Sequence, residues 1–144
     1  MAEEEQEPKK YFSVPEAEAL IPELTRIMET AMDAHSEAQG IRAALQGEQR
    51  RIMVSGGGII DPASWKERAG RLEALASRVQ KGIETVVRLE GIPKDLGIGL
   101  VDFLFLLDGE EVNLCWRFGE KKIRFWHGLD EGFAGRKPIP DELT

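Results

Sequence analysis

The residues best suited to chemistry lie between residues 99 and 139, in the last third of the chain. This stretch contains the only cysteine of the protein and one of its two histidines, with carboxylates and arginines close by in sequence. The candidate ligand-binding residues are Asp102, Cys115, Arg117, Arg124, Trp126, His127 and Arg136. Because guanidinium groups bind carboxylates and phosphates through paired hydrogen bonds, the three arginines favour a pocket for a small anion. The alternative for Arg136 is an ion pair with Asp130 or Asp102 that only fixes the C-terminal loop.

Cys115 and His127, with Asp130 and Glu131 close behind, suggest a thiol nucleophile or a metal site. A nucleophilic cysteine needs a base within hydrogen-bond reach and a cationic setting that lowers its pKa. Zinc needs three or four protein ligands. One cysteine and one nearby histidine, which are not spaced in sequence as metal ligands are, favour neither a thiol nucleophile nor a metal site. The simpler interpretation is a half-buried cysteine under Trp126 and a histidine bonded to a backbone carbonyl or to Asp130. We therefore predict no metal and no cofactor, and assign no catalytic residue.

The elements that must position these residues are three short strands, which we predict from the strand-like apolar pattern. The strands are Leu100–Leu107, Val112–Arg117 and Lys122–Trp126. Asp108-Gly109 suits the type I′ turn of a hairpin. A second turn containing Gly119 joins the second and third strands.

Pairing Leu107 with Glu110 and Arg117 with Lys122 assigns each side chain to one face of the sheet. One face is apolar and consists of Val101, Phe103, Phe105, Val112, Leu114, Trp116, Ile123 and Phe125, with His127 at its end. The other face holds one row of Asp102, Cys115 and Arg124 and a second row of Leu104, Asn113 and Trp126, completed by Leu100, Arg117 and Lys122. This register places His127 and Cys115 on opposite faces.

Two long helices are predicted before the sheet. Ser13-Val14-Pro15-Glu16 is a capping box that starts the first helix. Apolar residues then recur at alternating spacings of three and four, and Pro22 predicts a kink or restart. Asp61-Pro62 starts the second helix, and the glycine-rich stretch 55–58 makes the pair antiparallel. Each helix of about 30 residues is ~45 Å long, so the hairpin should extend beyond the sheet as an arm.

The fold class is therefore α+β: a long antiparallel helical hairpin, a small three-stranded antiparallel β-meander and a C-terminal loop. The domain boundaries that we predict are a disordered acidic tail at 1–11 and a single domain at 12–144. Within the domain, the hairpin covers 13–91, the sheet 99–127 and the loop 128–144.

Composition and charge limit the class of protein. The 144 residues suit a single domain, and the lone cysteine leaves no intramolecular disulfide. No apolar run reaches the ~20 residues of a membrane span, and the acidic start is unlike a signal peptide, so we expect a cytoplasmic protein with no membrane contact. The net charge of −7 argues against a general nucleic-acid binder. Residues 41–71 nevertheless carry +3, with the remainder at −10.

The chain also resembles a known prokaryotic family. The motifs are GLVDF at 99–103, LCWRFGEKKIRFWHGLDEGFAGRKPI at 114–139 and ALIPEL near the start of the first helix. Together they resemble the uncharacterised domain of unknown function 2203, over nearly the whole chain. Leu104 stands where this family usually has proline. The resemblance implies no activity, substrate or cofactor.

Three functions follow as hypotheses. The first is a protein-interaction or self-association module, because the hairpin is longer than the sheet can cover. The second is a small-anion-binding or enzymatic site on the outer sheet face and the C-terminal loop. The third is RNA contact through the basic hairpin tip, although the overall charge disfavours nucleic acid. Because the interaction module is ranked first, we expect a non-enzymatic protein, with the enzymatic site kept as the alternative.

Overall fold

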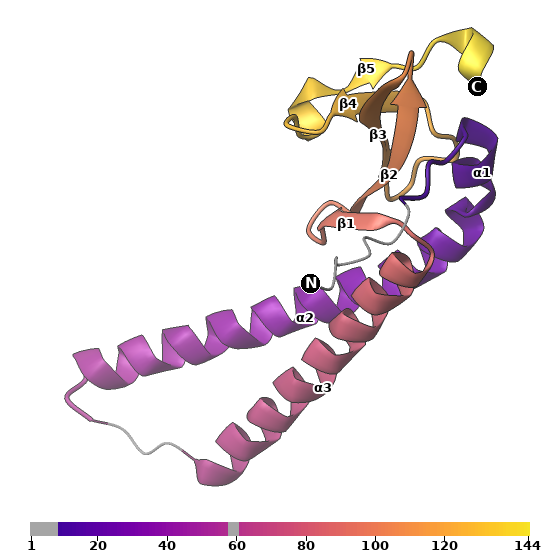
Figure 1. Cartoon of the computed structure of the whole chain (residues 1–144). Coiled ribbons are helices and arrows are strands. Elements are labelled where there is room, and N and C mark those ends of the chain that lie inside the picture. The colour runs from indigo at the N-terminus through magenta and orange to yellow at the C-terminus, as the bar shows by residue number, and fades with distance from the viewer. Residues whose placement is uncertain (1–8, 58–60) are drawn as a thin grey trace, which may run out of the picture.

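The computed structural model describes residues 9–57 and 61–144. Figure 1 shows a long helical hairpin with a small sheet at its base. The helices are α1 (Val14–Ala19), α2 (Ile21–Val54) and α3 (Pro62–Arg88). The strands are β1 (Ile92–Asp95), β2 (Leu100–Leu107), β3 (Glu110–Arg117), β4 (Phe125–Gly128) and β5 (Lys137–Pro138), with short 3-10 helices at Phe133–Gly135 and Asp141–Leu143. The α+β class is confirmed.

The hairpin begins as the sequence predicts. Ser13 and Glu16 form both hydrogen bonds of the capping box, and the chain restarts at Leu20, between α1 and α2, two residues before Pro22. Asp61 caps α3 by accepting a hydrogen bond from the amide of Ala63. The predicted break at 55–58 falls at the end of α2, and residues 58–60 lie outside the described residues.

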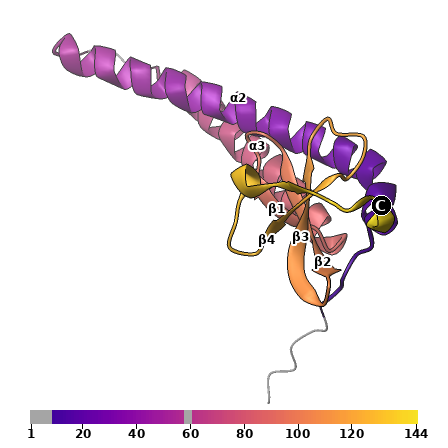
Figure 2. The same ribbon diagram turned by 90° about the horizontal axis from the view of Figure 1, so that it is seen from above.

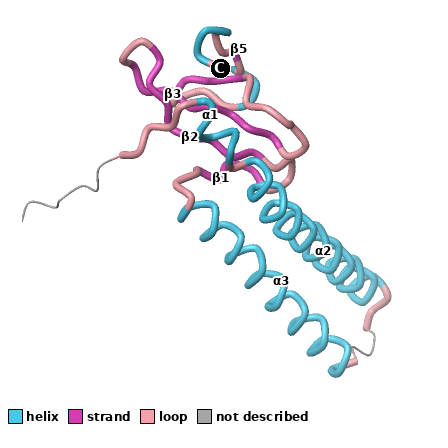
Figure 3. Tube along the Cα trace, turned by 90° about the vertical axis from the view of Figure 1, so that its right-hand side faces the viewer, coloured by secondary structure: helices cyan, strands magenta, loops and turns pink. Residues whose placement is uncertain are grey.

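Small residues allow α2 and α3 to approach closely near the sheet. A Cβ atom at Gly82 would lie only 2.9 Å from the Cβ of Ala31. Ala34, Ala38 and Leu75 form a second buried cluster further out. Figures 1 and 3 show the two helices diverging toward their far ends. None of the described helices has both the length and the apolar content of a membrane span.

The sheet contains five antiparallel strands in sequential order, two more than predicted. The additional strands β1 and β5 lie at the two edges. Each contains a proline: Pro93 lies between the predicted hairpin and the predicted sheet, and Pro138 lies in the predicted C-terminal loop. Proline lacks an amide donor but is tolerated at a sheet edge, where that side of the strand pairs with nothing.

The predicted register holds for the first hairpin and is wrong for the third strand. Asp108 and Gly109 have φ values of 51° and 81°, as a type I′ turn requires, and Leu107 pairs with Glu110. The third strand, however, begins at Phe125, which pairs with Cys115. This shift of one residue exchanges the two faces for every β4 side chain.

The main core lies between the helices and one face of the sheet, and Figure 2 shows these elements from above. It includes Phe103, Leu114 and Trp116 from the predicted apolar face, with Leu24 and Met28 from α2. Of the predicted tail, residues 1–8 lie outside the described residues. Lys9 and Tyr11 contact Glu111 on β3.

Candidate functional site

Three titratable side chains meet on the sheet face opposite the main core: Asp102, Cys115 and His127. They are 1%, 1% and 3% exposed, respectively. One ligand atom from each lies within 4.8 Å of the other two. Each residue comes from a different strand, with Asp102 directly opposite Cys115 and His127 opposite Asn113. The strands hold these groups on a rigid scaffold, and we call them the Asp-Cys-His cluster.

The ring of His127 is fixed by a backbone contact. Its Nδ1 lies 2.8 Å from the carbonyl oxygen of Gly128. A carbonyl oxygen only accepts, so Nδ1 must donate. Its Nε2 lies 2.9 Å from the Oδ2 atom of Asp102. In a neutral imidazole, Nε2 then has a lone pair that faces the carboxylate.

The carboxyl group of Asp102 is buried without a well-directed hydrogen bond from any described residue. Its closest contact, with His127 Nε2, is short but poorly directed for a hydrogen bond. Burial raises the pKa of the Asp102 carboxyl, and the nearby His127 and Lys94 oppose that rise. An unsatisfied buried carboxylate costs free energy, so this arrangement is more typical of a binding site than of a structural core.

The thiol of Cys115 is not activated as a nucleophile. Burial and the negative charge of Asp102 raise its pKa to about 12, against the opposing effect of Arg136. At neutral pH the side chain is therefore a thiol, whereas a nucleophilic cysteine must be a thiolate.

A pocket of about 370 Å³ opens beside the cluster. Its lining residues are Lys94, Asp95, Ile98, Leu100, Asp102, His127, Glu131, Gly132 and Phe133. They supply three carboxylates against one lysine. The walls combine this negative charge with the apolar side chains of Ile98, Leu100 and Phe133.

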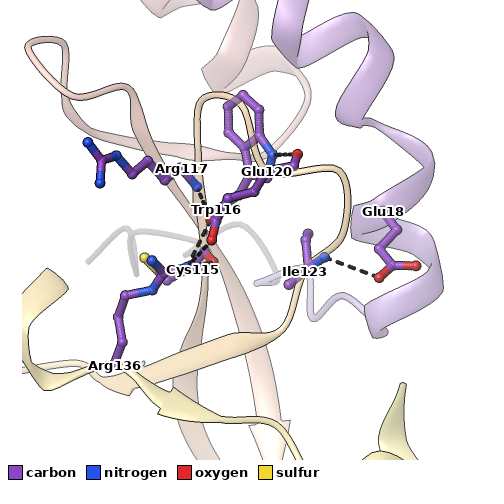
Figure 4. A network of polar contacts seen from close by, with 7 residues as sticks. All are labelled: Glu18, Cys115, Trp116, Arg117, Glu120, Ile123 and Arg136. Atoms are coloured by element: carbon purple, nitrogen blue, oxygen red, sulfur yellow. Dashed lines mark hydrogen bonds and ion pairs between the residues drawn. The ribbon is translucent and has the colours of Figure 1, made fainter.

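The C-terminal segment is held against this face by Arg136, as Figure 4 shows. Its Nη2 lies 2.8 Å from both carboxylate oxygens of Glu120. The guanidinium also stacks on two rings, with its carbon 4.1 Å from the centroid of Phe125 and 4.8 Å from that of Phe133. Arg136 thus fixes the loop through Glu120, and not through Asp130 or Asp102.

The structure brings together only part of the predicted site. Asp102, Cys115 and His127 converge, and Arg136 lies beside them, 3.5 Å from the carbonyl oxygen of Cys115. The other three predicted residues are not part of the Asp-Cys-His cluster. Arg117 places its guanidinium over the Phe133 ring at 5.5 Å. Arg124 precedes β4 and is exposed, and Trp126 packs on the main core.

Sequence reasoning missed Glu120 and Lys94 as parts of this region, and it noted Glu131 only as an acid that follows His127 in sequence. Glu120 lies in the second turn, where its Oε1 also accepts the amide of Arg117 at 2.7 Å. A carboxylate in a turn beside a glycine is too common in sequences to single it out. Lys94 belongs to the unpredicted strand β1.

Replacing Arg136 with lysine should lower the free energy of unfolding by about 1–2 kcal/mol, because lysine keeps the charge but loses the planar guanidinium that stacks on Phe125 and Phe133. Its side chain is only 13% exposed, and that of Glu120 is 26% exposed. The control is Arg71→Lys, where the exposed pair with Glu37 should change stability by less than about 0.5 kcal/mol. Urea unfolding measures both, and equal losses would contradict this account.

A family model described as an uncharacterized conserved protein (DUF2203) matches residues 10–139. Neither a curated protein nor a solved structure matches the chain. The family description names no activity, so a function must be argued from the site.

Proposed function

The chain belongs to the family of uncharacterized conserved proteins DUF2203, and we propose that it binds a small cationic ligand in the pocket beside Asp102 and His127. One observation carries the proposal: the carboxyl group of Asp102 is 1% exposed, lies at the pocket wall and lacks a well-directed hydrogen bond from the described residues. A positively charged ligand supplies the missing partner.

The other carboxylates of the pocket already have partners. Asp95 accepts the backbone amide of Gly97 at 2.7 Å. Glu131 accepts the Nζ of Lys137 at 2.7 Å and the amide of Gly128 at 3.1 Å. Their charges still make the pocket negative, which attracts a cation. Asp102 is the group left to contact it directly.

The arrangement of the arginines disfavours the small-anion site that the sequence suggests. The Arg136 guanidinium is neutralised by Glu120 and covered by two aromatic rings. The Arg117 guanidinium stacks on Phe133, and Arg124 lies outside the pocket lining. The groups that an anion needs are therefore either occupied or elsewhere.

A thermal-shift comparison tests the proposal. Among small amines, guanidinium compounds and divalent metal ions, at least one should bind the protein and raise its melting temperature. Carboxylates and phosphates at equal ionic strength should leave the melting temperature unchanged. Asp102→Asn should abolish the response, and the exposed Asp33→Asn on α2 should leave it intact. A response to anions alone, or a cation response unchanged in Asp102→Asn, would contradict the proposal.

The arm supports a second candidate function, self-association. The end of α2 exposes Met53 at 82% and Val54 at 89%, on a part of the hairpin that extends beyond the sheet (Figure 1). Apart from the pairs of Arg68 with Glu48 and Arg71 with Glu37, residues 41–71 still carry four basic against two acidic side chains, and the rest of the chain is acidic, so two antiparallel copies would bring opposite charges together. We expect a dimer at low salt that dissociates at high salt. A monomer at high protein concentration in light scattering would rule it out.

Contact with RNA through the arm is less favoured. Arg68 forms an ion pair with Glu48 at 2.8 Å, and Arg71 forms one with Glu37 at 2.7 Å. These arginines are therefore already neutralised by the neighbouring helix.

A cytoplasmic location is part of the proposal, since the lone Cys115 stays a free thiol in a reducing compartment.

A further inference from the structure

We propose that the cationic ligand is a divalent transition-metal ion of the zinc class, held by the carboxylate of Asp102, the sulfur of Cys115 and Nε2 of His127. This inference rests on the proposed function, because it names the ligand of the same pocket. It adds Cys115 to the binding groups, a residue that an organic cation has no need to contact.

The donor set selects the class of metal. One oxygen, one sulfur and one nitrogen suit a borderline-soft ion such as Zn²⁺ or Co²⁺. Mg²⁺ and Ca²⁺ are bound by oxygen ligands and gain nothing from sulfur or imidazole. Binding replaces the thiol proton by a metal–sulfur bond and releases that proton to water.

The geometry is close to what such an ion requires. The three donor atoms lie within 4.8 Å of one another, and Nε2 of His127 lies 2.9 Å from Oδ2 of Asp102. Tetrahedral zinc with bonds of about 2.0–2.3 Å holds its ligand atoms roughly 3.3–3.7 Å apart. The Nε2–Oδ2 separation lies slightly below this range and the 4.8 Å limit lies above it, so the donors are already spaced approximately as such an ion requires.

The surroundings prepare His127 and Asp102 as ligands. Donation from Nδ1 to the carbonyl of Gly128 at 2.8 Å directs the lone pair of Nε2 into the cluster. Metal-bound histidines commonly make this second contact, which fixes the ring and its tautomer. When the imidazole is neutral and the carboxyl group is ionised, two acceptors face each other, Nε2 and a carboxylate that lacks a directed donor among the described residues. A metal ion between them satisfies both.

The pocket supplies a position for further ligands. Asp102 and His127 belong both to the cluster and to the pocket lining, so an ion bound between them faces the open space. Three protein ligands with one open position distinguish reactive zinc sites from structural sites, which use four. The fourth position takes water or a donor atom of a small molecule.

Titration of the full chain with Co²⁺, after treatment with a chelator, tests the proposal. Co²⁺ should bind one ion per chain and produce the near-ultraviolet absorption of a thiolate-to-cobalt bond. Zn²⁺ should displace it and raise the melting temperature, whereas Mg²⁺ should do neither. The absence of the thiolate band from the wild-type protein would overturn the proposal without any need for a variant.

The variants then assign the ligands. Cys115→Ser should remove the thiolate band. Loss of a residue that only supports a metal ligand weakens metal binding roughly 10–100-fold, so His127→Gln and Asp102→Asn, which remove ligands, should weaken it at least as much. His35→Gln is the matched control, because His35 is the only other histidine and lies on α2. Affinity unchanged in both His127→Gln and Asp102→Asn would also overturn the proposal.

The outcomes separate this inference from the proposed function. If no metal binds but amines stabilise the wild-type protein and not Asp102→Asn, the metal assignment fails and the cation pocket stands. If neither metals nor amines act through Asp102, both fail. One ion per chain with a thiolate band that Cys115→Ser removes supports both.

Discussion

Replacing Trp116 with alanine should lower the free energy of unfolding by about 3–5 kcal/mol, the range for large aromatic residues in cores. Its side chain is fully buried in the main core. The indole Nε1 also donates to the carbonyl oxygen of Glu120 at 2.9 Å. Because small domains are stable by only about 5–15 kcal/mol, this loss would remove a large part of the total. Urea unfolding followed by circular dichroism measures it.

Two further tryptophan variants separate volume from hydrogen bonding. Trp116→Phe keeps most of the buried area and should cost less than Trp116→Ala, the loss of the hydrogen bond accounting for about 1 kcal/mol. Trp65→Ala is the control, since Trp65 is half-buried on the arm, at the start of α3. A loss for Trp65→Ala as large as that for Trp116→Ala would contradict our view of where the core lies.

The same tryptophan connects the core to the candidate site. Trp116 holds the backbone of Glu120, and the Glu120 carboxylate holds Arg136, whose segment covers the sheet face. Figure 4 shows this chain of contacts. Trp116→Phe should therefore also weaken the fixation of the C-terminal segment, while Trp65→Ala should leave it unchanged.

The helices were predictable because their signals are local. The Ser13-Glu16 capping box, the restart before Pro22 and the Asp61 cap each depend on residues within one helical turn. The apolar spacing of three and four then extends over many residues, so one atypical position does not change the prediction. The first hairpin was predictable for a similar reason, since Asp108-Gly109 sets the register of β2 and β3.

The site was only partly predictable because it depends on a register that no local signal fixes. The turn between β3 and β4 is longer than predicted, with β4 beginning at Phe125, and a shift of one residue moves a side chain to the other face. The sequence prediction therefore separated His127 from Cys115 and paired Cys115 with Arg124. That separation argued against a pair formed by Cys115 and His127, and the observed pairing of Cys115 with Phe125 removes it.

The C-terminal cover could not be derived from the sequence either. Its contacts join residues far apart in the chain, such as Arg136 with Glu120 and Ile139 with Arg124. The sequence identifies Arg136 as a candidate ligand-binding residue, but the ion-pair partners that it suggests are Asp130 and Asp102, not Glu120. Alternation along strands indicates which side chains share a face, yet it gives no information on the segment that packs over that face.

Replacing Gly99 with alanine should destabilise the protein by about 3 kcal/mol, from two separate causes. Gly99 has a φ of +74°, and a Cβ atom there would lie 2.5 Å from the Cβ of Phe118 and 2.8 Å from the sulfur of Met32. The left-handed backbone costs an L-residue about 1–2 kcal/mol, and overpacking typically adds about 1–3 kcal/mol. The Met32 side chain can move aside, whereas the Cβ of Phe118 is fixed to the backbone. Urea unfolding again measures the change.

Two other glycines separate the backbone strain from the steric clash. Gly109 has a φ of +81° with no heavy atom within 4 Å of its added Cβ, so Gly109→Ala should cost only the backbone strain of about 1–2 kcal/mol. Gly40 lies inside α2 with equally open surroundings, so Gly40→Ala should stabilise the protein by about 0.5–1 kcal/mol. The expected order of stability is Gly40→Ala, wild type, Gly109→Ala, Gly99→Ala. If Gly99→Ala lowered the free energy of unfolding no more than Gly109→Ala does, the clash with Phe118 would have to relax. That result would contradict the close packing of Gly99 against α2 and the end of β3.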